Sequence, residues 1–229
     1  MNTESKEELY KQLVHKASLK QDVYQNTMKA FNLFKESIIN IEKDFHKRIK
    51  KPKHAIPFEH RNRGDFEIEL KFAGDVLIFM MHTNVFETPR DHFINKTSYV
   101  KEDKDRAYCG IINIYNFLGD SFKYNRVNDS GYLIGRIFIN KDMHYYIEGK
   151  RELGALFSNF VTSEMDKEAA SKIVESAIQY TINFDLLIPP YETVKEVSVF
   201  EFLSKLDSIT LKTGKRLGFQ FQADPDETK

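Results

Sequence analysis

The first 50 residues carry an apolar side chain at every seventh position, and charged or amide residues fill most of the spaces between. These positions are Tyr10, Ala17, Tyr24, Phe31, Ile38 and Phe45. Apolar residues at this spacing share one side of an α-helix, so the pattern predicts a helix from residue 4 to about residue 50. Neither proline nor glycine interrupts it before Pro52. Unbroken, such a helix is about 70 Å long, too long to pack wholly on one small domain.

Two arrangements satisfy this apolar stripe. Lys20 and Thr27 interrupt the apolar row beside it, which allows a break near residues 17–21 and hence a helical hairpin. An unbroken helix would instead present the stripe to a second copy of the chain and form a homodimer. In that case we expect Phe31 and Ile38 to lie at the interface.

The middle of the chain has the patterns of β-strands. Residues 65–73 alternate between apolar and charged side chains, which is typical of a half-exposed strand. Residues 76–86 and 108–118 are apolar on both sides and predict interior strands, with a helix as the alternative for 108–118. Residues 131–148 predict a hairpin that turns near Lys141. Because the connections are short, the expected sheet is mainly antiparallel and has about five to six strands.

The last third of the chain predicts helices. Residues 163–184 repeat apolar side chains with helical spacing after a capping signal, and a shorter helix is expected over residues 150–160. Residues 194–206 favour a helix over a strand, and residues 218–222 predict an edge strand. The fold class is therefore α+β. We expect two parts, a helical arm over residues 1–51 and an α+β domain over residues 52–229.

Composition narrows the class of protein. The chain has 34 basic and 34 acidic side chains, and this balance argues against a dedicated binder of nucleic acid or of membrane surfaces. The N-terminal residues lack the apolar stretch of a signal peptide, and no run approaches the ~20 apolar residues of a membrane span. The single cysteine, Cys109, suits a reducing compartment. We therefore expect a cytoplasmic protein.

Motifs for catalysis and cofactor binding are missing from the sequence. It contains no glycine-rich phosphate loop, no HExxH, no CxxC and no GxSxG. No two histidines have the spacing of metal ligands, so no metal site is predicted and the cofactor, if any, stays unknown. We interpret Cys109 as a small buried hydrophobic residue rather than a nucleophile.

Arg136 is the most informative polar residue, because it shares its side of a predicted strand with apolar and aromatic residues. Its guanidinium needs a carboxylate, an aromatic ring or an anionic ligand. An ion pair with Glu148 or Asp142 is the simpler interpretation. A ligand pocket is the alternative, and its expected residues are Arg136, Tyr145, His82 and Asn113.

Three functions follow from these observations. The first is a non-enzymatic module that binds a ligand or a protein and dimerises through the N-terminal helix. The second is an enzyme with a dispersed site around His82, His144 and Arg136. The third is a nucleic-acid-associated protein that uses residues 46–63, where seven Lys or Arg accompany one Glu. No interleaved aromatic residues support base stacking there, so we rank the third below the first.

Overall fold

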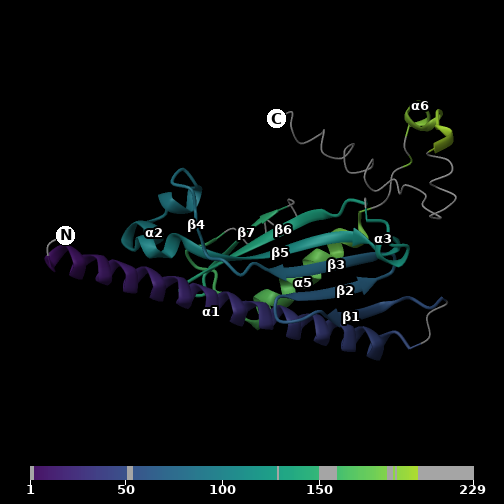
Figure 1. Ribbon diagram of the computed structural model, residues 1–229. Coiled ribbons are helices and arrows are strands. Elements are labelled where there is room, and N and C mark those ends of the chain that lie inside the picture. The colour runs from purple at the N-terminus through teal and green to yellow at the C-terminus, as the bar shows by residue number, and fades with distance from the viewer. Residues whose placement is uncertain are drawn as a thin grey trace.

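A computed structural model describes residues 3–50, 54–127, 129–149, 159–184, 188 and 190–200. Its described part consists of one long helix, an antiparallel sheet and several shorter helices, which confirms the α+β class (Figure 1). The long helix lies along one side of the sheet and extends well beyond it at the N-terminal end. Most of the predicted helix over residues 150–160, the predicted helix over residues 194–206 beyond residue 200, and the predicted edge strand over residues 218–222 lie outside the described residues.

Helix α1 runs without a break from Thr3 to Arg48, so the predicted alternative of a hairpin is wrong. Its buried residues begin at Leu19 and continue to Ile38. Phe31 and Ile38 are fully buried in the core of their own chain, and the expectation that a second copy covers them is also wrong. The heptad stripe identified an apolar side of the helix correctly, but most of that side packs on the sheet.

The sheet follows the chain order, with one short strand added at the side. The strands are β1 (Phe58–Asn62), β2 (Glu67–Phe72), β3 (Asp75–Met81), β4 (Phe86–Glu87), β5 (Tyr108–Leu118), β6 (Tyr132–Asn140) and β7 (Tyr145–Gly149). Their order is β1-β2-β3-β5-β6-β7, β4 pairs with β5, and every pair is antiparallel. This confirms the predicted interior strands and the β6–β7 hairpin. Strand β1 was not predicted, because it falls in a charged stretch without alternation.

Shorter helices complete the described fold. They are η1 (Phe93–Lys96), α2 (Ser98–Glu102), η2 (Lys104–Ala107), α3 (Gly119–Lys123), α5 (Lys167–Ile182) and α6 (Tyr191–Val194). Helix α5 begins where Asp166 accepts a hydrogen bond from the Ala169 amide at 2.7 Å, four residues later than the predicted start at residue 163.

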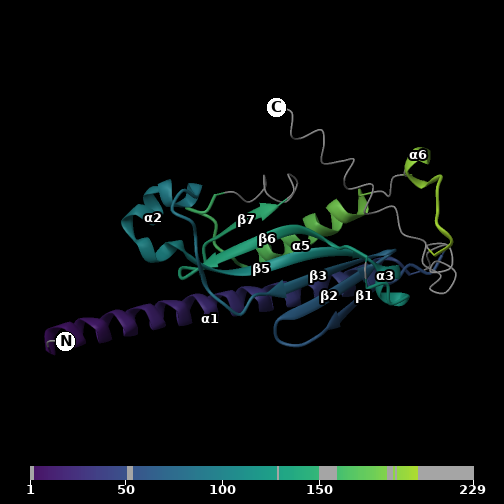
Figure 2. The same cartoon turned by 45° about the horizontal axis from the view of Figure 1, so that its top comes forward.

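Helices α1 and α5 cover the same face of the sheet (Figure 2), which we call the inner face. Helix α1 also covers the edge strand β1. The His60 amide donates to Glu42 Oε1 at 3.3 Å, and His46 Nε2 contacts the Phe58 carbonyl oxygen at 2.9 Å. Two backbone groups at the free edge of β1 therefore have partners, which limits edge-to-edge pairing with another sheet.

Helix α1 approaches the sheet closely at Thr27 and Gly110. A β-carbon on Gly110 would lie 2.0 Å from Thr27 Oγ1, so only glycine fits this position of β5. Thr27 is fully buried, and its hydroxyl donates to the Val23 carbonyl oxygen at 2.7 Å. Thr27 therefore interrupts the apolar row without leaving a polar group unsatisfied.

We predict that Gly110→Ala lowers the free energy of unfolding by about 1–3 kcal/mol, because the added methyl group forces α1 away from β5. Gly74→Ala is the matched control, since nothing lies within 4 Å of the point that a β-carbon would occupy there. Urea unfolding of both variants measures the difference. Equal effects of the two substitutions would show that the α1–β5 contact is looser than described.

Candidate functional site

The outer face of the sheet, opposite α1 and α5, carries side chains in rows that cross the strands. Strand register aligns Ile78, Tyr115 and Leu133 in one row. The next row is Glu67, Met80, Asn113, Arg136 and Glu148. Side chains directly opposite each other on one face are close enough to interact, so these rows define what the outer face presents.

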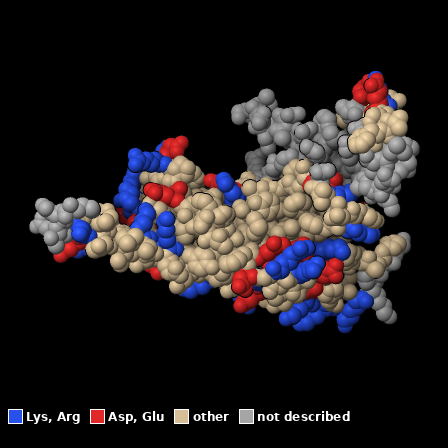
Figure 3. All heavy atoms as spheres, viewed as in Figure 1, with Lys and Arg blue, Asp and Glu red and all other residues tan. Residues whose placement is uncertain are grey.

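Described helices cover one end of the outer face, whereas side chains at the other end are partly exposed. Helices η1 and α2 close one end over a buried cluster that comprises Ile94, Tyr99, Val100, Ala107, Cys109, Phe138, Tyr146 and Phe160. Beyond this cover Ile78, Tyr115 and Phe117 are only partly buried, and Leu133 and Phe122 are more than 40% exposed. We call these five residues the outer patch. Figure 3 shows a broad uncharged surface over the centre of this view, beside a mixed band of both charges.

Arg136 lies between the covered end and the outer patch. Its Nη2 contacts Glu148 Oε2 at 2.5 Å, and the second oxygen of Glu148 lies 3.0 Å from His92 Nε2. The ion pair between Arg136 and Glu148 is the simpler of the two sequence interpretations, and it is confirmed. Asn113 lies directly opposite Arg136, and its side-chain oxygen is buried without a hydrogen-bond partner.

The four predicted ligand residues do not form one site. Arg136 and Asn113 are neighbours on the outer face, and the alternation of β3 places His82 on the same face one row further along. Tyr145 instead belongs to the core of the inner face. It lines an open hollow of about 390 Å³ beside the start of α5, together with Glu164, Asp166 and Lys172.

The two histidines of the enzyme hypothesis have separate surroundings. His82 Nδ1 accepts a hydrogen bond from the Asn84 amide at 3.0 Å, and its ring packs against Phe86. His144 stacks on Tyr99 with ring centroids 4.7 Å apart, and its Nδ1 lies 3.0 Å from the Phe160 carbonyl oxygen. Neither histidine contacts Arg136 in any described interaction, so no shared catalytic centre is assembled from these three residues.

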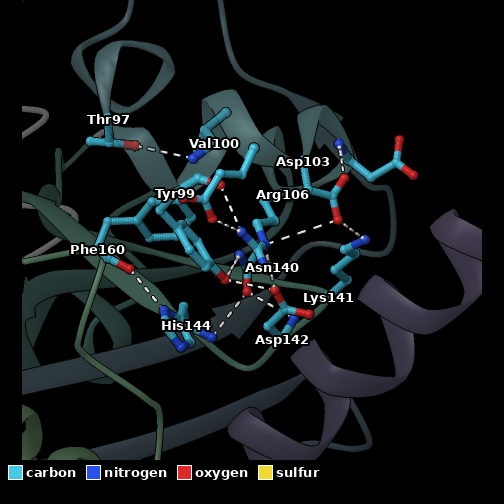
Figure 4. A network of polar contacts seen from close by, with 12 residues as sticks. Thr97, Tyr99, Val100, Asp103, Arg106, Asn140, Lys141, Asp142, His144 and Phe160 are labelled. Carbon is cyan, nitrogen blue, oxygen red and sulfur yellow. Dashed lines mark hydrogen bonds and ion pairs between the residues drawn. The ribbon is translucent and has the colours of Figure 1, made fainter.

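A polar network joins the covering helices to the turn between β6 and β7 (Figure 4). Asn140 is fully buried and donates to the Tyr99 hydroxyl oxygen at 3.0 Å, while its own oxygen accepts from the amides of Asp142 and His144. The Tyr99 hydroxyl in turn donates to Asp142 Oδ2 at 2.8 Å, and Arg106 Nε contacts the same oxygen at 3.0 Å. The network was not predicted, because its members are distant in sequence.

Tyr99 and Asp103 are titratable groups of this network whose pKa values are shifted. Burial raises the pKa of the Tyr99 hydroxyl, which therefore stays protonated and remains a donor. The contact with Lys141 Nζ at 2.5 Å lowers the pKa of the Asp103 carboxyl group, against a smaller opposing effect of desolvation.

Helix α1 joins the network where Asn26 donates to the Lys141 carbonyl oxygen at 2.6 Å. The cover, the hairpin and α1 are thus fixed to one another.

Other candidate chemistry has little support in the described residues. Cys109 is fully buried, and desolvation raises the pKa of its thiol, as its interpretation as a core residue requires. Among the described residues no group of three or more His, Cys, Asp or Glu side chains could hold a metal ion. No helix in the described part of the chain is long and apolar enough to span a membrane.

The basic stretch over residues 46–63 is partly engaged within the fold. Arg63 Nη2 contacts Glu69 at 2.6 Å, and His60 and His46 bind partners between α1 and β1. Residues 51–53, which supply two of its lysines, lie outside the described residues. Comparisons with protein-family models, curated proteins and solved structures found no match for this chain.

We predict that Asn140→Ala lowers the free energy of unfolding by about 3 kcal/mol, because it leaves two backbone amides and one hydroxyl group without their buried partner. Asn84→Ala, at an exposed position, is the control and should change stability by no more than about 0.5 kcal/mol. Urea unfolding measures both. A cost below about 1 kcal/mol for Asn140→Ala would mean that the network does not hold the cover in place.

The Asp103–Lys141 contact predicts a pH-dependent stability. A carboxyl group whose pKa is lower in the folded state stabilises the fold at neutral pH and loses that contribution as pH falls through the folded-state pKa, here below the ordinary value of 3.8. Asp103→Asn should therefore be less stable than the parent at pH 7, and the difference should shrink toward pH 3. A difference that is constant between these pH values would exclude the ion pair as its cause.

Proposed function

We propose that this protein is a non-enzymatic protein-interaction module that forms a homodimer through the N-terminal part of α1. The observation that carries the proposal is an exposed apolar stripe on the projecting arm, which we define as residues 5–18. Its members are Leu9, Tyr10, Leu13 and Val14, with exposed fractions between 49% and 63%. Four large apolar side chains grouped on one side of a helix are typical of a helix–helix interface.

The arm is held in a helical conformation before any partner binds. It continues directly from the part of α1 that packs on the sheet, so no new helix has to be nucleated. Two contacts attach its last turn to the domain. Lys16 Nζ donates to the Tyr108 hydroxyl oxygen, and His15 Nε2 lies 3.0 Å from Asp105 Oδ2. A preformed helix lowers the entropic cost of association.

The charge distribution along the arm favours a second copy in antiparallel orientation. Lys6, Glu7 and Glu8 precede the stripe and carry one net negative charge, and Lys11 and Lys16 lie after its first apolar pair. An antiparallel pair places the acidic turn of one arm beside the basic turns of the other, whereas a parallel pair aligns like charges. The same segregation of charge supports self-association over a partner of a single charge sign.

The enzyme and nucleic-acid hypotheses have less support. The charge of Arg136 is matched by Glu148, His82 and His144 have separate surroundings, and Arg63 and two histidines of the basic stretch have partners within the fold. A small ligand near Asn113 stays a secondary proposal, supported by its buried oxygen without a partner.

We predict that the protein is a dimer at micromolar concentration and that Leu13→Glu weakens the dimer at least about 30-fold, equivalent to about 2 kcal/mol. The substituted side chain is exposed in the single chain, so the fold should be unaffected. Gln12→Glu adds the same charge on another side of the arm and should leave the dimer intact. Sedimentation equilibrium measures both constants. A monomeric parent protein, or a Leu13→Glu variant that dimerises as well as the parent, would contradict the proposal.

A further inference from the structure

Two apolar surfaces of the described chain have no part in the proposed dimer. One is the outer patch, and the other is a segment after α5, residues 188 and 190–200, which we call the C-terminal strap. We propose that the outer patch is a docking surface for the C-terminal strap of the same chain. This inference does not depend on the proposed dimer, since neither surface belongs to the projecting arm.

The outer patch is a continuous apolar surface. Ile78, Tyr115 and Leu133 lie opposite one another on β3, β5 and β6. The ring centroids of Tyr115 and Phe117 are 6.5 Å apart, and those of Phe117 and Phe122 are 5.3 Å apart in an edge-to-face arrangement. The patch therefore extends from the centre of the sheet to α3. Exposed apolar surfaces of this kind mark interaction sites in soluble proteins.

The strap has the composition of a segment that is buried when it functions. Its large apolar side chains have exposed fractions between 47% and 93%, and they are Ile188, Tyr191, Val194, Val197, Val199 and Phe200. The polar residues among them are mainly one lysine, Lys195, and two glutamates, Glu192 and Glu196, so no strong charge opposes docking on an uncharged surface. Burial of a large apolar side chain stabilises a protein by about 1.5–3 kcal/mol, and each of these side chains lacks that stabilisation while it is exposed.

The strap starts at the end of the sheet that carries the outer patch. Phe184, just after α5, lies 6.3 Å from Tyr132 between ring centroids, and Tyr132 immediately precedes Leu133 of the patch. Figures 1 and 2 both place α6, the first part of the strap, at the end of the molecule that carries α3. Phe184 therefore lies beside β6, the strand that carries Leu133 of the outer patch.

The length of the connection is sufficient. Fifteen residues lie between Phe184 and Phe200, and this length of chain spans up to about 50 Å when extended. The three strands under the patch are about 10 Å across, since neighbouring strands lie about 4.8 Å apart. A segment tethered this closely has an effective concentration in the millimolar range, which favours the strap of the same chain over that of another molecule. A docked strap would also restrict access of any outside partner to the patch.

Disulfide trapping in the full-length chain tests the proposal. The only natural cysteine, Cys109, is fully buried, so introduced thiols can be paired without replacing it. The test chain carries Leu133→Cys in the patch and Val194→Cys in the strap. The control chain carries Lys172→Cys and Val194→Cys, because Lys172 is exposed on α5 at the opposite face of the sheet.

Under mild oxidation we expect an intramolecular disulfide in the test chain at least about tenfold faster than in the control chain. Equal rates in the two chains would overturn the proposal. Disulfides that form mainly between molecules would overturn it as well, because the occupant of the patch would then be a second copy.

Thiol labelling gives a second measurement in the full-length chain. With the strap docked, the thiol introduced by Leu133→Cys reacts slowly with a soluble maleimide. Adding Tyr191→Ser, Val194→Ser and Phe200→Ser should raise that rate several-fold, and these exposed positions are not needed for folding. The rate for Lys172→Cys should not change. An unchanged rate for Leu133→Cys, with the protein still folded, would show that the strap does not cover the patch.

Discussion

The length of α1 relative to the sheet is the constraint on which the rest of the structure depends. The helix has 46 residues and is about 70 Å long, whereas the longest strand, β5, has 11 residues and spans about 37 Å. A straight helix of this length cannot pack on the sheet along its whole course. Burial begins at Leu19, and the turns before it extend past the sheet with their apolar side chains exposed. The division of one helix into a packed part and a projecting arm is therefore a geometric consequence of the sequence having no break.

The two faces of the sheet differ in how much of each is covered by helices. In the described part of the chain, α1 and α5 cover the inner face, and η1, α2 and η2 cover one end of the outer face. The network around Asn140 and Tyr99 fixes this cover to the β6–β7 hairpin, and Asn26 connects it to α1. The same few hydrogen bonds therefore decide which part of the outer face is core and which part is available for docking. The two candidate binding surfaces, the projecting arm and the outer patch, each begin where packing against other described elements of the chain ends.

Periodicity in the sequence predicted most elements of the described fold, because helical and extended segments bury one side with characteristic spacing. It did not predict β1, whose edge position leaves no alternation to detect. It also assigned Phe31 and Ile38 to a dimer interface. The heptad spacing identifies the apolar side of α1, but it does not show whether the sheet or a second copy covers that side. Tyr145 was placed with Arg136 because the side of a strand residue depends on register, and register is set by long-range pairing. The Arg136–Glu148 ion pair was predictable because a hairpin brings its two strands into contact.

The central claim is that one part of α1 packs on its own sheet and the projecting arm forms a dimer. Hydrogen exchange of the α1 amides, followed as a function of protein concentration, tests this claim most directly. We expect strong protection of residues 23–41 at every concentration, since these residues pack on their own sheet. Residues 7–14 should exchange faster in dilute protein and become protected as the concentration rises through the dimer dissociation constant. Protection of residues 7–14 that does not change with concentration, or fast exchange of residues 23–41, would contradict the division of α1 into a packed part and a projecting arm.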